Sequence, residues 1–125
     1  MSLFSFVDST YYNGKSISEL LDKTLTSVDI PSTYQGAKVV QLEVHSFYSA
    51  AIEKVFIPKT IKYIRECAFQ DCHKLTEVRF ELGSELENMD DDVFAFDYSL
   101  KKIDIPSSLK KLLNYLLCSR YLSSF

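Results

Sequence analysis

One short pattern of apolar and polar positions occurs four times along the chain. Each copy has an apolar residue, two variable residues, a β-branched residue, one variable residue and a second apolar residue. All three prolines follow directly after a copy. Apolar residues at alternate positions predict a short, half-buried strand, and proline is tolerated where a strand ends. The four predicted strands lie within residues 25–31, 52–58, 75–80 and 100–106.

A second pattern fills the intervals between these strands. It places two apolar residues three positions apart and then a small or apolar residue followed by phenylalanine. We expect Phe47, Phe69 and Phe94 to stack as an aromatic column inside the wall opposite the strands. Two intervals are longer around Gly36 and Gly83, whose backbone freedom suits surface bulges.

The spacing of the copies predicts the fold. Their last apolar residues, Ile30, Ile57, Phe80 and Ile105, lie 27, 23 and 25 residues apart. A period of about 20–29 residues with one strand per copy is typical of a leucine-rich-repeat solenoid. One turn cannot bury its own apolar face, so successive turns stack around a continuous core. The sequence therefore predicts an α/β fold: a short leucine-rich-repeat solenoid, with a parallel β ladder of about four turns and terminal caps.

Residues 57–80 carry a more specific pattern. It contains an Ile-Pro pair, two isoleucines three apart, Ala68-Phe69, then Cys72 and Leu75 at intervals of three, and a closing Val-x-Phe. Together with the other copies, over about residues 25–117, it resembles the BspA-like, or treponemal-type, leucine-rich repeats. This family is known for surface proteins of oral and gut bacteria and of parasitic protists, and for binding host or matrix proteins. The resemblance implies protein–protein recognition without catalysis.

Three positions depart from the family's pattern. Ala50 and Asp97 occupy, in the neighbouring copies, the position that Cys72 has in residues 57–80. Glu81 occupies the position that is proline after the other three strands. Because a carboxylate is costly to bury, Asp97 predicts a place where this wall opens to solvent.

The ends of the chain are predicted to cap the solenoid, since its terminal turns would otherwise expose apolar faces. Ser16 and Glu19 form a capping-box pattern, and Ile17 and Leu20 follow at helical spacing, which predicts a short N-terminal helix. Aromatic residues ahead of it, among them Phe4, can fold over the first turn. We divide the chain into an N-terminal capping segment (1–24), the repeats (25–106) and a C-terminal partial repeat or capping helix (107–125).

The C-terminal segment has more apolar residues than a cap requires. Five leucines lie on one helical face, and further apolar residues follow them. A cap, a self-association surface and a piece of a longer repeat array all fit this pattern. The leucines are Leu109, Leu112, Leu113, Leu116 and Leu117.

Alternation within the strands also predicts which side chains point outward. One outward row reads Ser27, Lys54, Glu77 and Lys102, and the other reads Asp29, Phe56, Arg79 and Asp104. An outward phenylalanine among charges has no packing role there, and Phe and Arg are enriched at interfaces. A solvated ladder of opposite charges that holds the register is an equally open interpretation. The candidate partner-binding residues are Lys54, Phe56, Glu77, Arg79, Lys102 and Asp104.

Charge and composition narrow the classes of partner. The net charge of −3 argues against a nucleic-acid-binding face, and no apolar run approaches the ~18 residues of a membrane span. The start of the chain lacks the pattern of a signal peptide, so we expect a cytoplasmic protein by default, with a surface location implied only by the family.

Residues 77–97 carry a net charge of −7 and residues 98–125 a net charge of +4. This asymmetry can steer a basic partner or orient a homo-oligomer.

The inventory of reactive residues argues against an enzyme. The three cysteines form neither a disulfide framework nor a zinc motif. A Cys–His nucleophile would need Cys67 or Cys72 exposed near His73, yet Cys72 occupies an inward position of the repeat. The acidic run 90–92 lacks the alternating ligands and glycine of a calcium loop. We expect no catalytic, cofactor or metal site.

Overall fold

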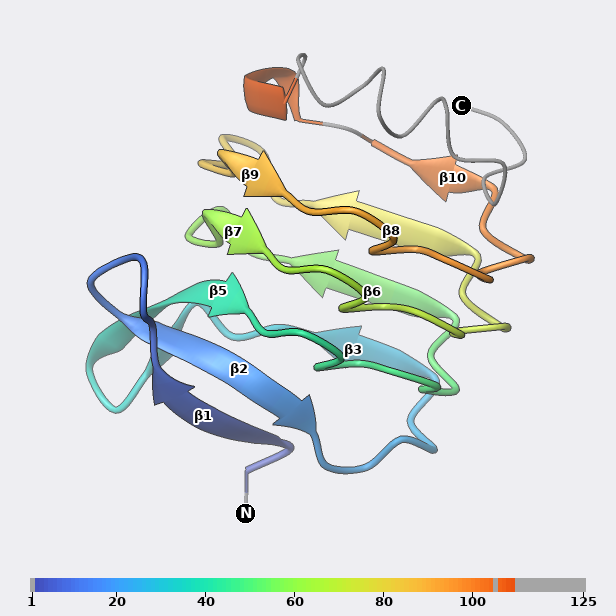
Figure 1. Cartoon of the computed structure of the whole chain (residues 1–125), viewed down its shortest axis with the longest axis horizontal. Helices are drawn as coiled ribbons and strands as arrows, with labels where there is room; N and C mark the ends of the chain where they lie inside the picture. The colour runs from blue at the N-terminus through green and yellow to red at the C-terminus, as the bar shows by residue number, and fades with distance from the viewer. Residues whose placement is uncertain (1, 105, 110–125) are drawn as a thin grey trace.

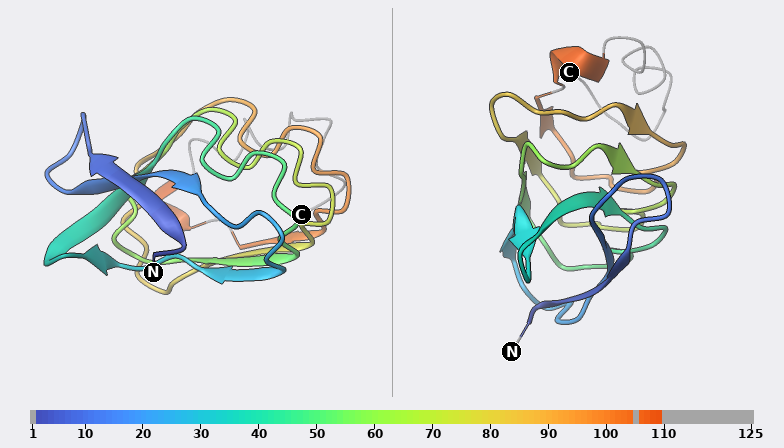
Figure 2. Two further views of the ribbon diagram at one scale, coloured as in Figure 1. Left: turned by 90° about the horizontal axis from the view of Figure 1, so that it is seen from below. Right: turned by 90° about the vertical axis from the view of Figure 1, so that its left-hand side faces the viewer.

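The chain forms a β-solenoid of about four turns, with two sheets facing each other across one core (Figures 1 and 2). The computed structural model describes residues 2–104 and 106–109. The first sheet is parallel and has the order β10-β8-β6-β3. Its strands fall inside the four predicted segments, so the predicted ladder is confirmed. They are β3 (Ser27–Asp29), β6 (Lys54–Ile57), β8 (Glu77–Phe80) and β10 (Lys102–Ile103).

The second sheet lies on the opposite wall of the solenoid. Its order is β1-β2-β5-β7-β9, and β4 pairs antiparallel with the outer end of β5. The pairs β2–β5, β5–β7 and β7–β9 are parallel, and β1–β2 is an antiparallel hairpin. The strands are β1 (Phe4–Asp8), β2 (Lys15–Leu20), β4 (Thr33–Tyr34), β5 (Ala37–Leu42), β7 (Tyr63–Ile64) and β9 (Asn88–Met89); a 3₁₀ turn, η1, covers Ser107–Leu109.

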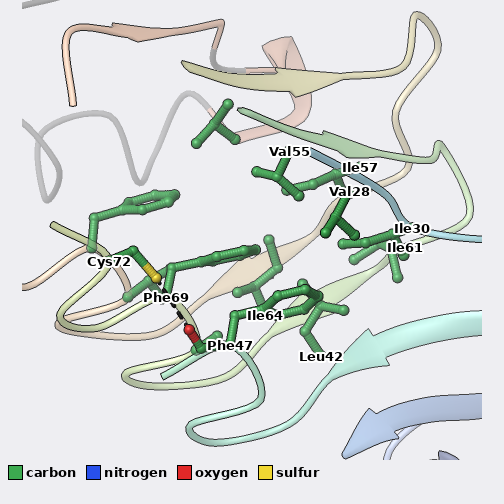
Figure 3. Packing of buried hydrophobic residues seen from close by; sticks show 14 of the residues in the cluster. Val28, Ile30, Leu42, Phe47, Val55, Ile57, Ile61, Ile64, Phe69 and Cys72 are labelled. Atoms are coloured by element: carbon green, nitrogen blue, oxygen red, sulfur yellow. Dashed lines mark hydrogen bonds between the residues drawn. The ribbon is translucent and has the colours of Figure 1, made fainter. Parts of the chain in front are cut away.

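Aromatic rings form a column within the core. The ring centroid of Phe69 lies 4.8 Å from that of Phe47 and 5.7 Å from that of Phe94, and all three rings are nearly parallel. All three side chains are buried in the core, and Figure 3 shows Phe47 and Phe69 beside apolar residues of the strands. The predicted phenylalanine column is confirmed.

The predicted N-terminal helix is wrong, because residues 15–20 form strand β2. Ile17 and Leu20 are both buried, although residues three apart face opposite sides of a regular strand. An irregularity in the β1–β2 register resolves this: Ser5 pairs with Glu19 and Phe6 with Ile17, so Ser18 is an extra residue. The bulge turns Ile17 and Leu20 to the same side, and β2 pairs with β5 instead of forming a helix.

The β1–β2 hairpin covers the first turn, as expected of the aromatic residues near the N-terminus. The ring of Phe4 lies edge-on to Phe47, 6.0 Å away, and extends the aromatic column by one member. Phe6 stacks on Tyr34 at 3.8 Å. Strand pairing and ring packing therefore fix this hairpin to the solenoid.

The two bulges predicted around glycines are tight turns. Gln35 and Gly36 join β4 to β5 with φ angles of 51° and 80°. Two positive φ angles in a two-residue connection match the right-handed twist of a hairpin. Gly83, with a φ of 83°, lies in the turn after β8.

The predicted opening at Asp97 is wrong. The Asp97 side chain is fully buried, and its Oδ1 accepts a hydrogen bond from the backbone N–H of Cys72 at 2.8 Å. That bond ties two successive turns together, which gives the carboxyl group a place inside the wall. The C-terminal alternatives rest largely on residues 110–125, which lie outside the described part of the chain.

Candidate functional site on the first sheet

The strand register aligns five of the six predicted binding residues on the outer face of the first sheet, and the sixth, Asp104, is exposed directly after β10. Lys54 pairs with Ser27 on one side and Glu77 on the other, and Lys102 pairs with Glu77. Two residues further along the strands, Phe56 pairs with Asp29 on one side and with Arg79 on the other. The residues between the two rows are buried, so these side chains share one face of the sheet; they are Val28, Val55, Val78 and Ile103.

Phe56 is the apolar member of this face. Its exposed fraction is 36%, whereas its neighbours Val55 and Ile57 are buried. The aligned residues on both sides, Asp29 and Arg79, are exposed. The outward orientation predicted for Phe56 is confirmed.

The charges of this face are paired along a strand and not across strands. The Arg79 Nε lies 3.6 Å from Glu77 Oε2 on the same strand. It is the only ion pair on the first sheet among the residues that the structure describes. The Arg79 side chain is 67% exposed and the Glu77 side chain 19%, so solvent at the guanidinium limits what this pair contributes to stability. The geometry therefore leaves most of these charges available to solvent or to a partner.

A second group of polar and aromatic side chains lies on the opposite sheet. The loop between β1 and β2 places Tyr11 edge-on to Tyr63, with ring centroids 5.4 Å apart. The Arg65 guanidinium lies 5.6 Å from the centre of the Tyr11 ring. The Tyr12 hydroxyl donates a hydrogen bond to Glu87 Oε1, with the two oxygens 3.0 Å apart. These contacts dock the loop across successive turns of the solenoid.

Further contacts hold this group in place. The Tyr63 hydroxyl donates to Asp90 Oδ2 at 2.7 Å, and burial together with this acceptor raises the pKa of Tyr63 to about 12. Arg65 Nη1 lies 2.9 Å from Glu43 Oε1. The contacts between Tyr12 and Glu87 span 75 residues of sequence. Sequence reasoning missed the group, because no local pattern joins residues so far apart.

In the described part of the chain, no hydrogen bond joins Cys67 or Cys72 to a histidine. Cys72 is fully buried, its Sγ–H donates to the Phe47 carbonyl at 3.1 Å, and burial raises its pKa to about 12. Burial and nearby acids raise the pKa of Cys67 as well. His73 instead lies 3.5 Å from the Asp71 carboxylate and stacks on Tyr98. The inward position predicted for Cys72 is confirmed.

The described residues contain neither a metal-binding cluster nor a membrane-spanning helix. No group of three His, Cys, Asp or Glu side chains among residues 2–104 and 106–109 could hold a metal ion. Over the same residues, no helix has the length and apolar character needed to cross a membrane.

Comparison with solved structures finds the same architecture in bacterial proteins. A leucine-rich repeat protein of T. pallidum is 28% identical with a TM-score of 0.74, over 83% of this chain and 48% of that one. A Bacteroides ovatus protein is 26% identical with a TM-score of 0.71, over 88% and 30%. A Bacteroides capillosus protein, 21% identical, shows the fold alone, with a TM-score of 0.75 over 100% and 94%. This chain thus spans about half of the T. pallidum protein and about a third of the B. ovatus protein.

The repeats themselves match a described family. Residues 15–123 match the BspA type leucine rich repeat region in six copies. A search of curated proteins finds no match. The matched region begins with β2, so the family's pattern reaches into the segment that we assigned to the N-terminal cap. Fold, repeat pattern and matched length agree, and the chain belongs to the family of BspA-type leucine-rich-repeat proteins.

Proposed function

We propose that this chain is a non-enzymatic protein-binding module that uses the outer face of the first sheet. Leucine-rich repeats of this type are typically protein-interaction modules. Phe56 carries the proposal, because it is an outward phenylalanine beside charged side chains and is not among the residues packed against the core. The binding residues are Lys54, Phe56, Glu77, Arg79, Lys102 and Asp104.

The chemistry of this face suits a protein partner. An aromatic anchor next to an arginine is a common composition for the centre of an interface. The surrounding Lys and Asp side chains form a polar rim that selects a partner by charge. The sheet is built from consecutive turns, so its face is rigid and loses little entropy on binding.

A double substitution tests the proposal. Wild-type protein and a Phe56→Ser/Arg79→Glu variant are immobilised, and the proteins that each captures from lysate of the source cells are quantified. We expect wild type to retain a defined set that the variant loses. A Leu82→Ser variant serves as the control, because Leu82 is 95% exposed in the turn after β8. Equal melting temperatures show that the fold is unchanged, and equal capture by all three proteins would refute the proposal.

A further inference from the structure

The outward residues of the first sheet form complementary pairs within each strand. β3, β6 and β8 each carry one residue from each row, on either side of a buried residue; in the fourth copy Lys102 lies in β10 and Asp104 follows directly after it. Glu77 and Arg79 have opposite charges, as do Lys102 and Asp104. The other two pairs are complementary in a different way. Lys54 and Phe56 are a cation and an aromatic ring, and Ser27 and Asp29 are a hydroxyl and a carboxylate.

This arrangement is complementary to itself. A two-fold axis along the ladder, between the two rows, would stack a second copy face to face with strands antiparallel. Each strand would then lie over its own equivalent, and each row would face the other row. Glu77 of one copy would meet Arg79 of the other, and Lys102 would meet Asp104. Lys54 would lie over Phe56, an arrangement suited to a cation–π contact.

From this complementarity we infer that a second copy of this chain is a partner of the first sheet. The inference rests on the proposed function, since it names an occupant for the same face. An interface of this symmetry uses the same patch on both copies, so each contact occurs twice.

The shape of the sheet permits the contact. Seen along the ladder, β3, β6, β8 and β10 lie nearly over one another, so the sheet has little twist (Figure 2, left). Strand spacing of about 4.8 Å is then the same in both copies. The two ladders can remain in register across the four strands of this sheet.

The charges also select one orientation. A two-fold axis parallel to the strands would place Asp29 of one copy over Asp104 of the other, and like charges in contact disfavour that dimer. The axis along the ladder brings no like charges together on these eight positions. Only the dimer about the axis along the ladder therefore avoids contact between like charges.

The predicted dimer is weak and sensitive to salt. Its ion pairs lie at the sheet surface, where the Arg79 side chain is 67% and the Glu77 side chain 19% exposed, so each contributes little and is screened by ions. We expect self-association to strengthen with protein concentration and to weaken with added salt. Sedimentation velocity of the full chain up to roughly 1 mM, at low and high salt, measures both effects.

Charge substitutions at one strand give a sharper test. Glu77→Arg leaves two cations on β8 and Arg79→Glu leaves two anions, so each variant alone would face its own like charges. We expect the dimer Kd of each single variant to be about tenfold or more higher than that of wild type. Mixing the two variants should restore it, because cations then face anions at both positions. The swapped double variant, Glu77→Arg/Arg79→Glu, should associate like wild type.

The outcomes separate this inference from the proposed function. Loss in both single variants and recovery in the mixture support a dimer about this axis. Monomeric wild type, or a mixture that stays monomeric, overturns the inference. If wild type is monomeric but the Phe56→Ser/Arg79→Glu variant still loses its captured protein, the proposed function holds without the dimer. If strand-face substitutions change neither property, both are refuted.

Discussion

Asp97 accepts a hydrogen bond from the backbone N–H of Cys72, one turn earlier in the solenoid, with N and Oδ1 2.8 Å apart. The two residues occupy the same position of successive repeats. Cys72 itself donates to the Phe47 carbonyl of the turn before. The Cys72 thiol, as a donor, and the Asp97 carboxyl group, as an acceptor, thus each link one turn to the backbone of the turn before.

The buried carboxyl group of Asp97 has an altered acidity. Burial raises its pKa to about 8, the nearby Asp71 carboxylate acts in the same direction, and the bond from Cys72 opposes them. Asp97 Oδ2 has no hydrogen-bond partner among the described residues. The group is therefore mainly protonated at pH 7 in the folded protein.

This pKa predicts that the folded state loses stability as the pH rises. Between about pH 4 and pH 8 the folded protein keeps the Asp97 proton, whereas the unfolded chain releases it. The free energy of unfolding should therefore fall by up to ~1.4 kcal/mol per pH unit. Urea unfolding at several pH values measures this slope. If the free energy of unfolding of wild type instead rises over this range, relative to that of an Asp97→Asn variant, the pKa of Asp97 is not raised in the folded protein.

Asp97→Asn isolates this effect. The amide has the shape of the protonated carboxyl group, keeps an oxygen for the Cys72 N–H and does not titrate. We expect the variant to match wild type near pH 4 and to be more stable near pH 8. Parallel pH profiles for the two proteins would show that Asp97 is ionised in the folded state.

Phe69→Ala tests the aromatic column. Phe69 is fully buried between Phe47 and Phe94, so its removal leaves a cavity in the middle of the stack. We expect a loss of about 3–5 kcal/mol in the free energy of unfolding. Phe56→Ala is the matched control and should cost less than ~1 kcal/mol, since Phe56 is partly exposed on the sheet surface. A cost below ~1 kcal/mol at Phe69 as well would mean that the column is wrong.

Gly14→Ala tests how the β1–β2 loop docks. A Cβ at this position would lie 2.6 Å from the Lys38 carbonyl oxygen and 3.0 Å from both Val40 methyl carbons, at a φ of 152°. We expect a loss of about 1–3 kcal/mol. At Gly36 nothing lies within 4 Å, so Gly36→Ala carries only the cost of its positive φ. Thermal unfolding of both variants should rank Gly14→Ala as the more damaging, and the reverse order would contradict the close approach.

The first sheet and its phenylalanine column could be predicted from the sequence because repeating residues define them. Val28, Val55 and Val78 hold the same place in successive strand patterns, and Phe47 and Phe69 hold the same place in the intervals between them, so stacked turns bring each set together. The outward row that contains Phe56 follows from the same alternation. Whether that face binds a protein does not follow from the repeats, since fold and function are separate.

The second sheet and the N-terminal hairpin could not be predicted in the same way. Strands β7 and β9 have two residues each, too few to show a period. In β2 the bulge at Ser18 gives Ile17 and Leu20 the three-residue spacing of a helix. Asp97 shows a different limit, because a carboxyl group in a repeat looks like a surface residue until its neighbours are known. Its burial depends on a partner 25 residues away.

Photo-crosslinking from the first sheet shows which molecule contacts its outer face. A benzophenone amino acid replaces Phe56 in one protein and Tyr98 in another, because Tyr98 is an exposed aromatic residue in a turn outside the first sheet. Irradiation in source-cell lysate, followed by mass spectrometry, identifies the proteins in contact with each position. If the first sheet is the binding face, a defined protein, or a second copy of this chain, is crosslinked from position 56 and not from position 98. Crosslinks from position 98 alone would contradict it.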